Sequence, residues 1–342
     1  MQKRIVKIAF ALTFLILAAF FLWAFPEEEK QQEICYYRNT GYVFGTYYNI
    51  RYQNSKDLHA QIKEVLEEFD NSMSAFNKES VLSNINYNKS NKTDRYFEQM
   101  YETAHYVSEL TNGAFDITVA PLVNAWGFGF ENQEQINKEI IDSLRQFVGY
   151  QKINLQGHKL YKQLPQIKID CGAIAKGQGC DVVAELLEKY DCKNYLVDIG
   201  GEVVCKGVNE QDKLWRVGIT RPTDDPEGTN QELQTIVSLK DMSMATSGNY
   251  RQFYYENGVR RSHTIDPRTG YPVNHSLLSA TVVAPSCMLA DALATSCMVL
   301  GTDSALLLIN SLDNAECYLI YAVEDTTAVV MTPKFNEWIE KQ

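Results

Sequence analysis

Hydrophobic residues recur along this chain with two different periods. Apolar positions three and four residues apart predict amphipathic helices over 58–69, 95–110, 136–148, 176–190, 288–300 and 302–311. Alternating or short apolar runs predict strands over 41–52, 152–155, 159–162, 194–199, 202–206, 214–219, 234–239, 252–256, 277–284, 316–322 and 327–331. Helices and strands are interspersed without a regular strand–helix–strand order. The pattern therefore predicts an α+β fold with largely antiparallel sheets rather than a Rossmann sheet.

The beginning of the chain follows a different pattern. Lys3, Arg4 and Lys7 precede the uncharged residues 8–25. A helix of that length spans roughly 27 Å, which just reaches across the hydrocarbon core of a bilayer. The preceding basic residues predict a cytoplasmic N-terminus and a main body on the other side of a bacterial inner membrane, the periplasmic side. We predict an uncleaved signal anchor at 1–25, with a cleaved signal peptide as the alternative.

The remaining residues divide into a short linker and one large domain. Residues 26–40 are mostly polar, and no period of 20 to 50 residues repeats after them, which excludes solenoids and propellers. We therefore predict a linker at 26–40 and a domain at 41–342.

Composition narrows the class of protein further. A hydrophobic content of 45% and a charged content of 22% are typical of a globular chain. The net charge of −11 argues against nucleic acid as a partner, because phosphate backbones are bound by clustered lysines and arginines. The eight cysteines lack C-x-x-C spacing. We expect most of them to be small buried residues without a disulfide framework.

The most informative chemistry lies in a polar loop and the helix that follows it. Residues 262–272 place His263 beside an Asp-Pro turn, an arginine and a glycine. Asp291 and Thr295 are four residues apart, so their oxygens share one face of the predicted helix. A carboxylate and a hydroxyl in that arrangement can hold a hard cation such as Mg²⁺. A lone histidine is usually structural, but beside a cation and phosphate it could accept a proton.

Each of three further motifs has two interpretations. Residues 169–177 are either a phosphate-binding loop at a helix N-terminus or a tight turn in which Asp170 caps the backbone. The glycine pair in 197–202 forms either a bulge or a surface for a flat ligand. The aromatic residues of 112–128 line a pocket or simply belong to the core.

Taken in order, these motifs resemble the ApbE family, the FAD:protein FMN transferases. The resemblance runs from about Gly45 to the end of the chain. The matching motifs are Phe44–Thr46, Met73–Phe76, Gly113–Asp116 with Pro121 and Trp126–Gly127, Asp170–Gly177, Asp198–Gly201, Ala245–Tyr250, His263–Pro272 and Asp291–Thr295.

The resemblance implies two α+β subdomains with a ligand site between them, and a Mg²⁺-dependent enzyme. Such an enzyme cleaves FAD, attaches FMN through phosphate to a serine or threonine of another protein, and releases AMP. His263 resembles the family's general base, and the metal ligands would be Asp291, Thr295 and the main-chain carbonyl of Ala173. The positions that resemble FAD contacts are Phe44, Phe76, Ala114, Phe115, Asp116, Asp170, Lys176 and the Ile265 backbone.

The family also suggests partners and alternatives. Its acceptors carry a Ser/Thr-Gly-Ala-Ser/Thr type site and are membrane redox subunits, beside which a membrane anchor would place this chain. Phe44 stands where many members have methionine, and Phe76 where others have tyrosine. An FAD pyrophosphatase that yields FMN and AMP, and a protein that binds FAD without cleaving it, are the alternatives.

Overall fold

The computed structural model describes residues 13–14, 34–129, 136–222, 232–249, 253–256, 259–324 and 326–340, with side chains described outside 253–262. Residues 36–342 form one compact unit, and residues 1–35 form a second. None of the helices in the described ranges is both long and apolar enough to cross a membrane. The predicted signal anchor lies outside the described residues except for Thr13 and Phe14.

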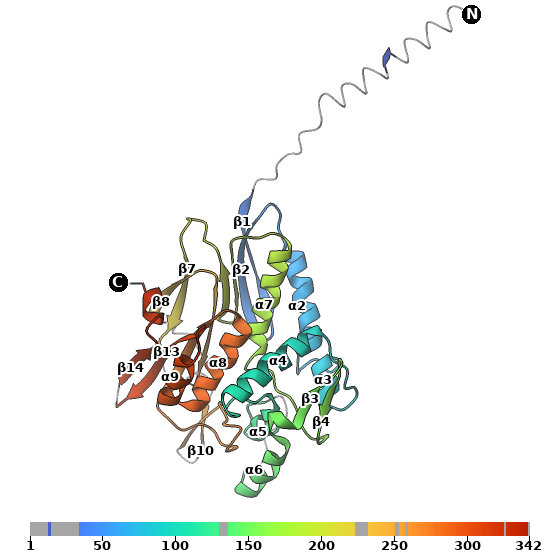
Figure 1. Ribbon diagram of the computed structural model, residues 1–342, viewed down its shortest axis with the longest axis vertical. Helices are drawn as coiled ribbons and strands as arrows, with labels where there is room; N and C mark the ends of the chain where they lie inside the picture. Colours follow the sequence, from blue (N-terminus) through green and yellow to red (C-terminus); the bar gives the residue numbers. More distant parts are fainter. Residues whose placement is uncertain are drawn as a thin grey trace, which may run out of the picture. The chain divides into compact units, whose positions relative to one another are not determined.

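An eight-stranded sheet organises the compact unit (Figure 1). Its strands follow the order β1-β2-β5-β6-β9-β12-β13-β14. Their bounds are β1 Cys35–Val43, β2 Thr46–Asn54, β5 Tyr195–Ile199, β6 Glu202–Lys206, β9 Met242–Gly248, β12 Leu277–Ala284, β13 Glu316–Val323 and β14 Thr326–Met331. The described pairings, such as β2 with β5 and β9 with β12, are antiparallel. This confirms the predicted α+β class with largely antiparallel sheets.

Three two-stranded sheets and a set of helices complete the described fold. The small sheets are β3 Ile153–Leu155 with β4 Leu160–Lys162, β7 Trp215–Thr220 with β8 Leu233–Leu239, and β10 Phe253–Glu256 with β11 Val259–Ser262. The α-helices are α2 His59–Met73, α3 Val81–Asn86, α4 Arg95–Leu110, α5 Ala120–Ala125, α6 Lys138–Leu144, α7 Ala175–Lys189, α8 Cys287–Leu300, α9 Thr302–Asn310 and α10 Phe335–Trp338. The 3₁₀ turns are η1 Ile117–Val119, η2 Arg145–Phe147 and η3 Tyr150–Lys152.

Alternation along the strands divides the core between the two faces of the large sheet. Val197 of β5 belongs to the main cluster, which packs against α2, α4, α7 and α8. Its neighbour Leu196 belongs to a second cluster with Trp215 of β7 and Phe335 of α10. Because successive strand residues point to opposite faces, helices cover one face and the β7–β8 hairpin covers part of the other. Figure 1 shows α7 and α8 side by side over the sheet.

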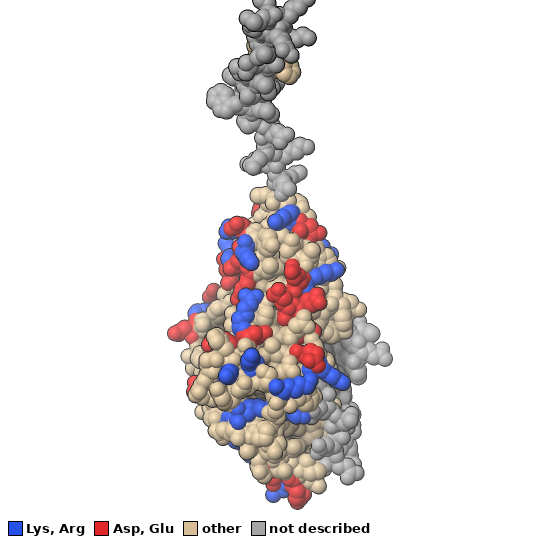
Figure 2. All heavy atoms as spheres, turned by 90° about the vertical axis from the view of Figure 1, so that its right-hand side faces the viewer, with Lys and Arg blue, Asp and Glu red and all other residues tan. Residues whose placement is uncertain are grey.

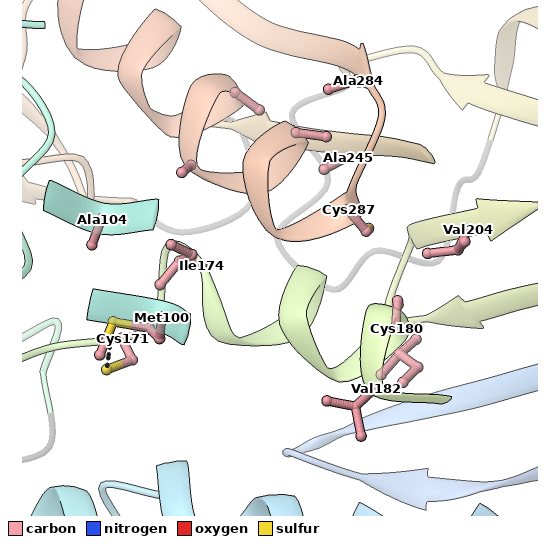
Figure 3. Close-up of a cluster of buried hydrophobic side chains, with 14 of the residues drawn as sticks. Met100, Ala104, Cys171, Ile174, Cys180, Val182, Val204, Ala245, Ala284 and Cys287 are labelled. Atoms are coloured by element: carbon pink, nitrogen blue, oxygen red, sulfur yellow. Dashed lines mark hydrogen bonds between the residues drawn. The ribbon is translucent and has the colours of Figure 1, made fainter. Parts of the chain in front are cut away.

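The contact between α7 and α8 is made of small side chains. Figure 3 shows Cys180 of α7 and Cys287 of α8 near Ala245 and Ala284 of the underlying strands. All eight cysteines are free thiols, and only Cys35 is exposed. The absence of a disulfide framework is therefore as predicted. Small residues at this contact let the two helices approach closely, and both helices carry predicted site residues.

Two features of the fold differ from the pattern predicted above. Residues 35–40, assigned to the linker, form the first part of β1, because β1 pairs with β2 at the edge of the large sheet. A central strand, β9, was not predicted at all. On the surface, basic and acidic side chains are interspersed over the face that Figure 2 shows.

Candidate active site

Hydrogen bonds lock α7 against α8 near their N-termini. The Gly177 amide donates to the Asp291 carboxylate at 3.0 Å. In the other direction, the Asp181 carboxylate accepts from the amides of Cys287 at 2.9 Å and Met288 at 2.8 Å. A β-carbon on Gly177 would lie 2.3 Å from the Cys287 carbonyl oxygen, so only glycine fits there. The sequence thus fixes the spacing of the two helices that carry Lys176 and Asp291.

A buried charge cluster lies beside this contact. The Lys176 Nζ is 2.5 Å from Oε1 of Glu202, whose side chain is 2% exposed against 35% for Lys176. Burial raises the pKa of Glu202 to about 7, with Asp291 adding to the rise and Lys176 opposing it. Burial also raises the pKa of Asp291. Burial works against the charge of Lys176, but Glu202 and Asp291 outweigh it, and the Lys176 pKa is raised.

The predicted metal ligands are hard oxygen atoms in a buried setting. Asp291 is buried, and Thr295 follows one turn later on α8, where its Oγ1 lies 3.1 Å from Oγ of Ser247. Ala173 is partly buried and immediately precedes the turn into α7. The described residues contain no group of three or more His, Cys, Asp or Glu side chains suited to a metal. A carboxylate, a hydroxyl and a carbonyl nevertheless fit a hard cation, and two carboxylates facing one lysine leave negative charge to neutralise.

The two predicted aromatic contacts differ in their surroundings. Phe44 lies in the β1–β2 turn with a φ of 51°, followed by Gly45 at 75°. Its ring packs edge-on against Phe69 at 5.3 Å between centroids, and a β-carbon on Gly179 of α7 would meet it at 2.7 Å. Phe76 is 84% exposed. The structure therefore brings Phe44 to α7 but leaves Phe76 at the surface.

The predicted residues of the 114–116 segment are buried. The side chains of Ala114 and Phe115 lie in the interior. Burial raises the pKa of Asp116, and its hydrogen bonds partly offset the rise. Its Oδ1 accepts from the Thr118 amide and hydroxyl at 2.8 and 2.6 Å, and its Oδ2 accepts from the Tyr150 amide at 2.7 Å. Asp116 thus joins η1 to η3, so the aromatic motif contributes to the core.

The 169–177 motif forms a tight turn before α7. The Asp170 Oδ1 accepts from the Gly172 amide at 2.7 Å, as in the capping interpretation. The Asp170 amide donates to the Ile117 carbonyl at 2.7 Å, which ties this turn to the 114–118 segment. Burial raises the pKa of Asp170. The turn and Lys176 therefore belong to one connected surface with the aromatic motif.

The 263–272 loop packs against the segment that follows the aromatic motif. The ring of His263 lies 6.3 Å from that of Phe128, and Ile265 is buried and pairs with Pro272. The Trp126 indole donates to the Gly270 carbonyl at 2.9 Å. These contacts hold His263 beside the small core formed by Leu122, Trp126, Ile141, Val148 and Ile265.

Two cavities in the described part of the protein are lined by none of the predicted site residues, although the first includes Asp198 and Gly201 of a matching motif. One, of about 440 Å³, lies on the hairpin side of the large sheet and is lined by Arg51, Asp198 and Trp215 among others. The other, of about 370 Å³, lies between α4, α7 and the start of α8. The assignment of the site therefore rests on the charge cluster and its chemistry, not on a cavity.

Glu202 is the residue that motif reasoning missed. It lies directly after Gly200 and Gly201, whose φ values of 68° and 99° form the β5–β6 turn. The glycine pair was interpreted as a bulge or a ligand surface, whereas it turns the chain between two paired strands. The signal that could have revealed Glu202 is a carboxylate at the first position of a buried strand, where an unpaired charge is unfavourable.

The fold is that of a family of enzymes. The family model described as "ApbE family" matches residues 44–319, and the chain therefore belongs to the ApbE family. Two curated relatives are called FAD:protein FMN transferase. The one from Haemophilus influenzae is 37% identical over 88% of this chain and 91% of its own length. The one from Escherichia coli K12 is 34% identical over 87% and 88%.

Solved structures give the same result. The flavin transferase ApbE from Vibrio cholerae superimposes with a TM-score of 0.80 and 35% identity, covering 90% of this chain and 100% of that chain. The flavinyl transferase ApbE from Pseudomonas stutzeri has a TM-score of 0.80 and 28% identity, covering 89% of this chain and 97% of that chain. The predicted family and fold class are both confirmed.

Proposed function

We propose that this protein transfers the FMN part of FAD to a hydroxyl group of an acceptor protein. It is similar to enzymes called FAD:protein FMN transferase over most of their length. The observation that carries the proposal is the cluster at the α7–α8 contact, where Lys176 meets the buried carboxylate of Glu202 and the Gly177 amide meets that of Asp291. Phosphoryl transfer depends mainly on positioning and on stabilising charge, and these groups suit both tasks.

The reaction balances without any further reactant. The oxygen of an acceptor serine or threonine forms a bond to the FMN phosphorus of FAD. The bond from that phosphorus to the AMP oxygen breaks, and AMP leaves with the electron pair. The acceptor hydroxyl loses its proton, and we assign His263 to take it, a role typically worth about 10²- to 10⁴-fold in rate.

We further propose that Asp291, Thr295 and the Ala173 carbonyl hold Mg²⁺. When bound, the cation would neutralise charge on the pyrophosphate. Lys176 would bind phosphate oxygens from the N-terminal turn of α7, where the helix dipole also favours an anion. Phe44, Phe76, the 114–116 segment, Asp170 and the Ile265 backbone are proposed to bind the remainder of FAD.

The proposal is tested with residues 36–342, FAD, Mg²⁺ and an acceptor domain carrying a Ser/Thr-Gly-Ala-Ser/Thr type site. The intact mass of the acceptor is measured with and without its target threonine. An FMN-sized gain that needs both the threonine and Mg²⁺ is expected. AMP released without a mass gain would instead support the pyrophosphatase. FAD that survives intact beside a competent acceptor would mean a flavin-binding protein.

We propose that the acceptor is a membrane redox subunit and that residues 1–25 anchor the catalytic domain on the periplasmic side of a bacterial inner membrane. The support for the anchor is the sequence alone: three basic residues precede an uncharged stretch that is long enough to span a membrane as a helix. Tethering both proteins to one membrane would raise the effective concentration of the acceptor. Digestion of the domain by protease added to spheroplasts is the expected result, and protection would contradict this placement.

A further inference from the structure

Glu202 stands apart from the other buried carboxylates of the site. In Asp116 and Asp181, both oxygens accept hydrogen bonds from the protein. In Glu202, Oε1 contacts Lys176, but Oε2 is fully buried and has no hydrogen-bond donor in the described part of the chain. A buried carboxylate oxygen without a donor is unfavourable and requires an explanation.

The location of Glu202 suggests what that oxygen is for. It begins β6, directly beneath the N-terminal turn of α7, and its backbone carbonyl accepts from the Cys180 thiol at 3.1 Å. Lys176 and Asp291 are the two charged groups that act on it most strongly. Oε2 of Glu202 therefore lies in the region where the proposed function places the pyrophosphate of FAD and its cation.

A structural role alone would be filled by an ordinary ion pair, and the same helix offers one. At the other end of α7, Glu188 Oε1 lies 2.5 Å from Lys206 Nζ, with side chains 50% and 41% exposed. Water can satisfy the second oxygen of Glu188, whereas Oε2 of Glu202 is covered in the ligand-free protein, so a donor reaches it only if ligand binding moves the side chains that cover it. The two pairs match in chemistry and distance and differ in burial, which makes Glu188 a control.

We infer that Glu202 is a positioning residue of the flavin site: Oε1 holds the Lys176 ammonium, and Oε2 accepts a hydrogen bond from an O–H group that enters with the ligand. This inference rests on the proposed function. The O–H group has two sources, namely water carried by the cation or a hydroxyl of the nucleotide. Either donor would give Oε2 the hydrogen bond that it lacks in the free protein.

Replacement of Glu202 by glutamine tests whether the side chain must accept from both Lys176 and the ligand. Glutamine keeps the size of the side chain but has one acceptor oxygen and one donor amide. If its oxygen faces Lys176, the amide meets the ligand donor; if its oxygen faces the ligand, the amide meets the ammonium. One contact is lost in both orientations, and the loss of a charge-assisted hydrogen bond predicts FAD binding weaker by about tenfold or more.

The experiment measures FAD affinity by flavin fluorescence for the wild type, Glu202→Gln and Glu188→Gln, in Mg²⁺ and in EDTA, and records each melting temperature. Glu202→Gln should bind FAD more weakly while Glu188→Gln matches the wild type. A loss seen only with Mg²⁺ identifies cation-bound water as the donor, and a loss in both conditions identifies a nucleotide hydroxyl. Equal affinity of the two variants in both conditions would overturn the inference.

A second variant is needed if Glu202→Gln is unstable. If Glu202→Gln melts well below the wild type, Glu202→Asp replaces it, since aspartate keeps the charge but is too short to hold Lys176. Weaker FAD binding by a stably folded Glu202→Asp supports the inference, and wild-type affinity overturns it. A wild type that binds no FAD in either condition would refute the proposed function, and the inference with it.

Discussion

Replacing Gly177 by alanine tests whether the close contact between α7 and α8 builds the site. The new β-carbon would lie 2.3 Å from the carbonyl oxygen of Cys287 and 2.8 Å from the β-carbon of Asp291. These atoms belong to the backbone and root of α8, so rotating a side chain cannot relieve the overlap. Because ordinary contacts begin near 3.4 Å, the two helices must separate by about 1 Å.

The magnitude follows from three contributions. Overpacking of this kind costs about 1–3 kcal/mol. Loss of the hydrogen bond from the Gly177 amide to the Asp291 carboxylate adds about 1.5–3 kcal/mol. Alanine in a helix interior returns about 1 kcal/mol relative to glycine. The expected net loss is roughly 1.5–5 kcal/mol, or a fall of roughly 2–8 °C in melting temperature for a domain of this size.

The same separation should impair flavin transfer. Displacement of a catalytic group by about 1 Å can cost on the order of 10²-fold in rate. Gly179→Ala is the matched control for stability, since it gains the same helix propensity but meets the ring of Phe44, which can turn aside. Scanning calorimetry should therefore rank Gly177→Ala well below Gly179→Ala, and the acceptor-mass assay compares Gly177→Ala with the wild type. A Gly177→Ala protein that melts at or above the wild-type temperature and transfers FMN normally would refute the reasoning.

Three other predictions follow from the same region. Asp291→Asn should abolish the rise in melting temperature and in AMP release that Mg²⁺ gives the wild type; an unchanged Mg²⁺ titration would contradict its role. His263→Ala should keep FAD affinity but slow transfer by about 10²-fold or more, as read from single-turnover acceptor mass. Wild-type transfer by that variant would exclude His263 as the base. Burial raises the pKa of Asp181 from 3.8 to about 7, so the contribution of its protonated form to stability is complete below about pH 3.8 and is lost as pH rises from there to about 7. Chemical unfolding of the wild type should thus show, between about pH 4 and 7, an extra loss of up to about 1.4 kcal/mol per pH unit that is absent in Asp181→Asn.

Periodicity predicted the elements that carry the site. The helices expected at 176–190 and 288–300 are α7 and α8, and the second ends at Gly301 with a φ of 78°, as a residue after a helix C-terminus should. α7 has an apolar side against the sheet and a polar first turn, whereas α8 is apolar along most of its length. Local sequence was sufficient there because burial and periodicity agree.

Periodicity failed for one strand in the middle of the large sheet. β9, Met242–Gly248, lies between β6 and β12, yet its small and hydroxyl-bearing residues show neither alternation nor the usual strand composition. Its small side chains leave room for α8, with which it packs closely. A strand specified by its neighbours rather than by its own residues cannot be predicted from one sequence.

The candidate residues came from motifs and from family resemblance, and their individual roles stay predictions. The roles of some of these residues could not be judged from the sequence, because burial depends on the tertiary fold. Asp116 resembles a ligand contact, but all of its nearest donors belong to the protein. Conversely, Glu202 shows no pattern of its own. Its contact with Lys176 exists because β6 passes under the first turn of α7, which only the tertiary fold determines.

The charges of the α7–α8 region give one physical reason for its chemistry. Asp181, Glu202 and Asp291 all have raised pKa values, in each case chiefly because they are buried. Lys176 is the cation that opposes this charge at Glu202 and Asp291. Replacing a whole buried ion pair by well-packed apolar residues is often neutral or stabilising, so stability alone does not require these charges. With these carboxylates in place the region attracts positive charge, and the adjacent N-terminus of α7 attracts an anion. A cation bound together with a pyrophosphate would satisfy both the carboxylates and the helix end.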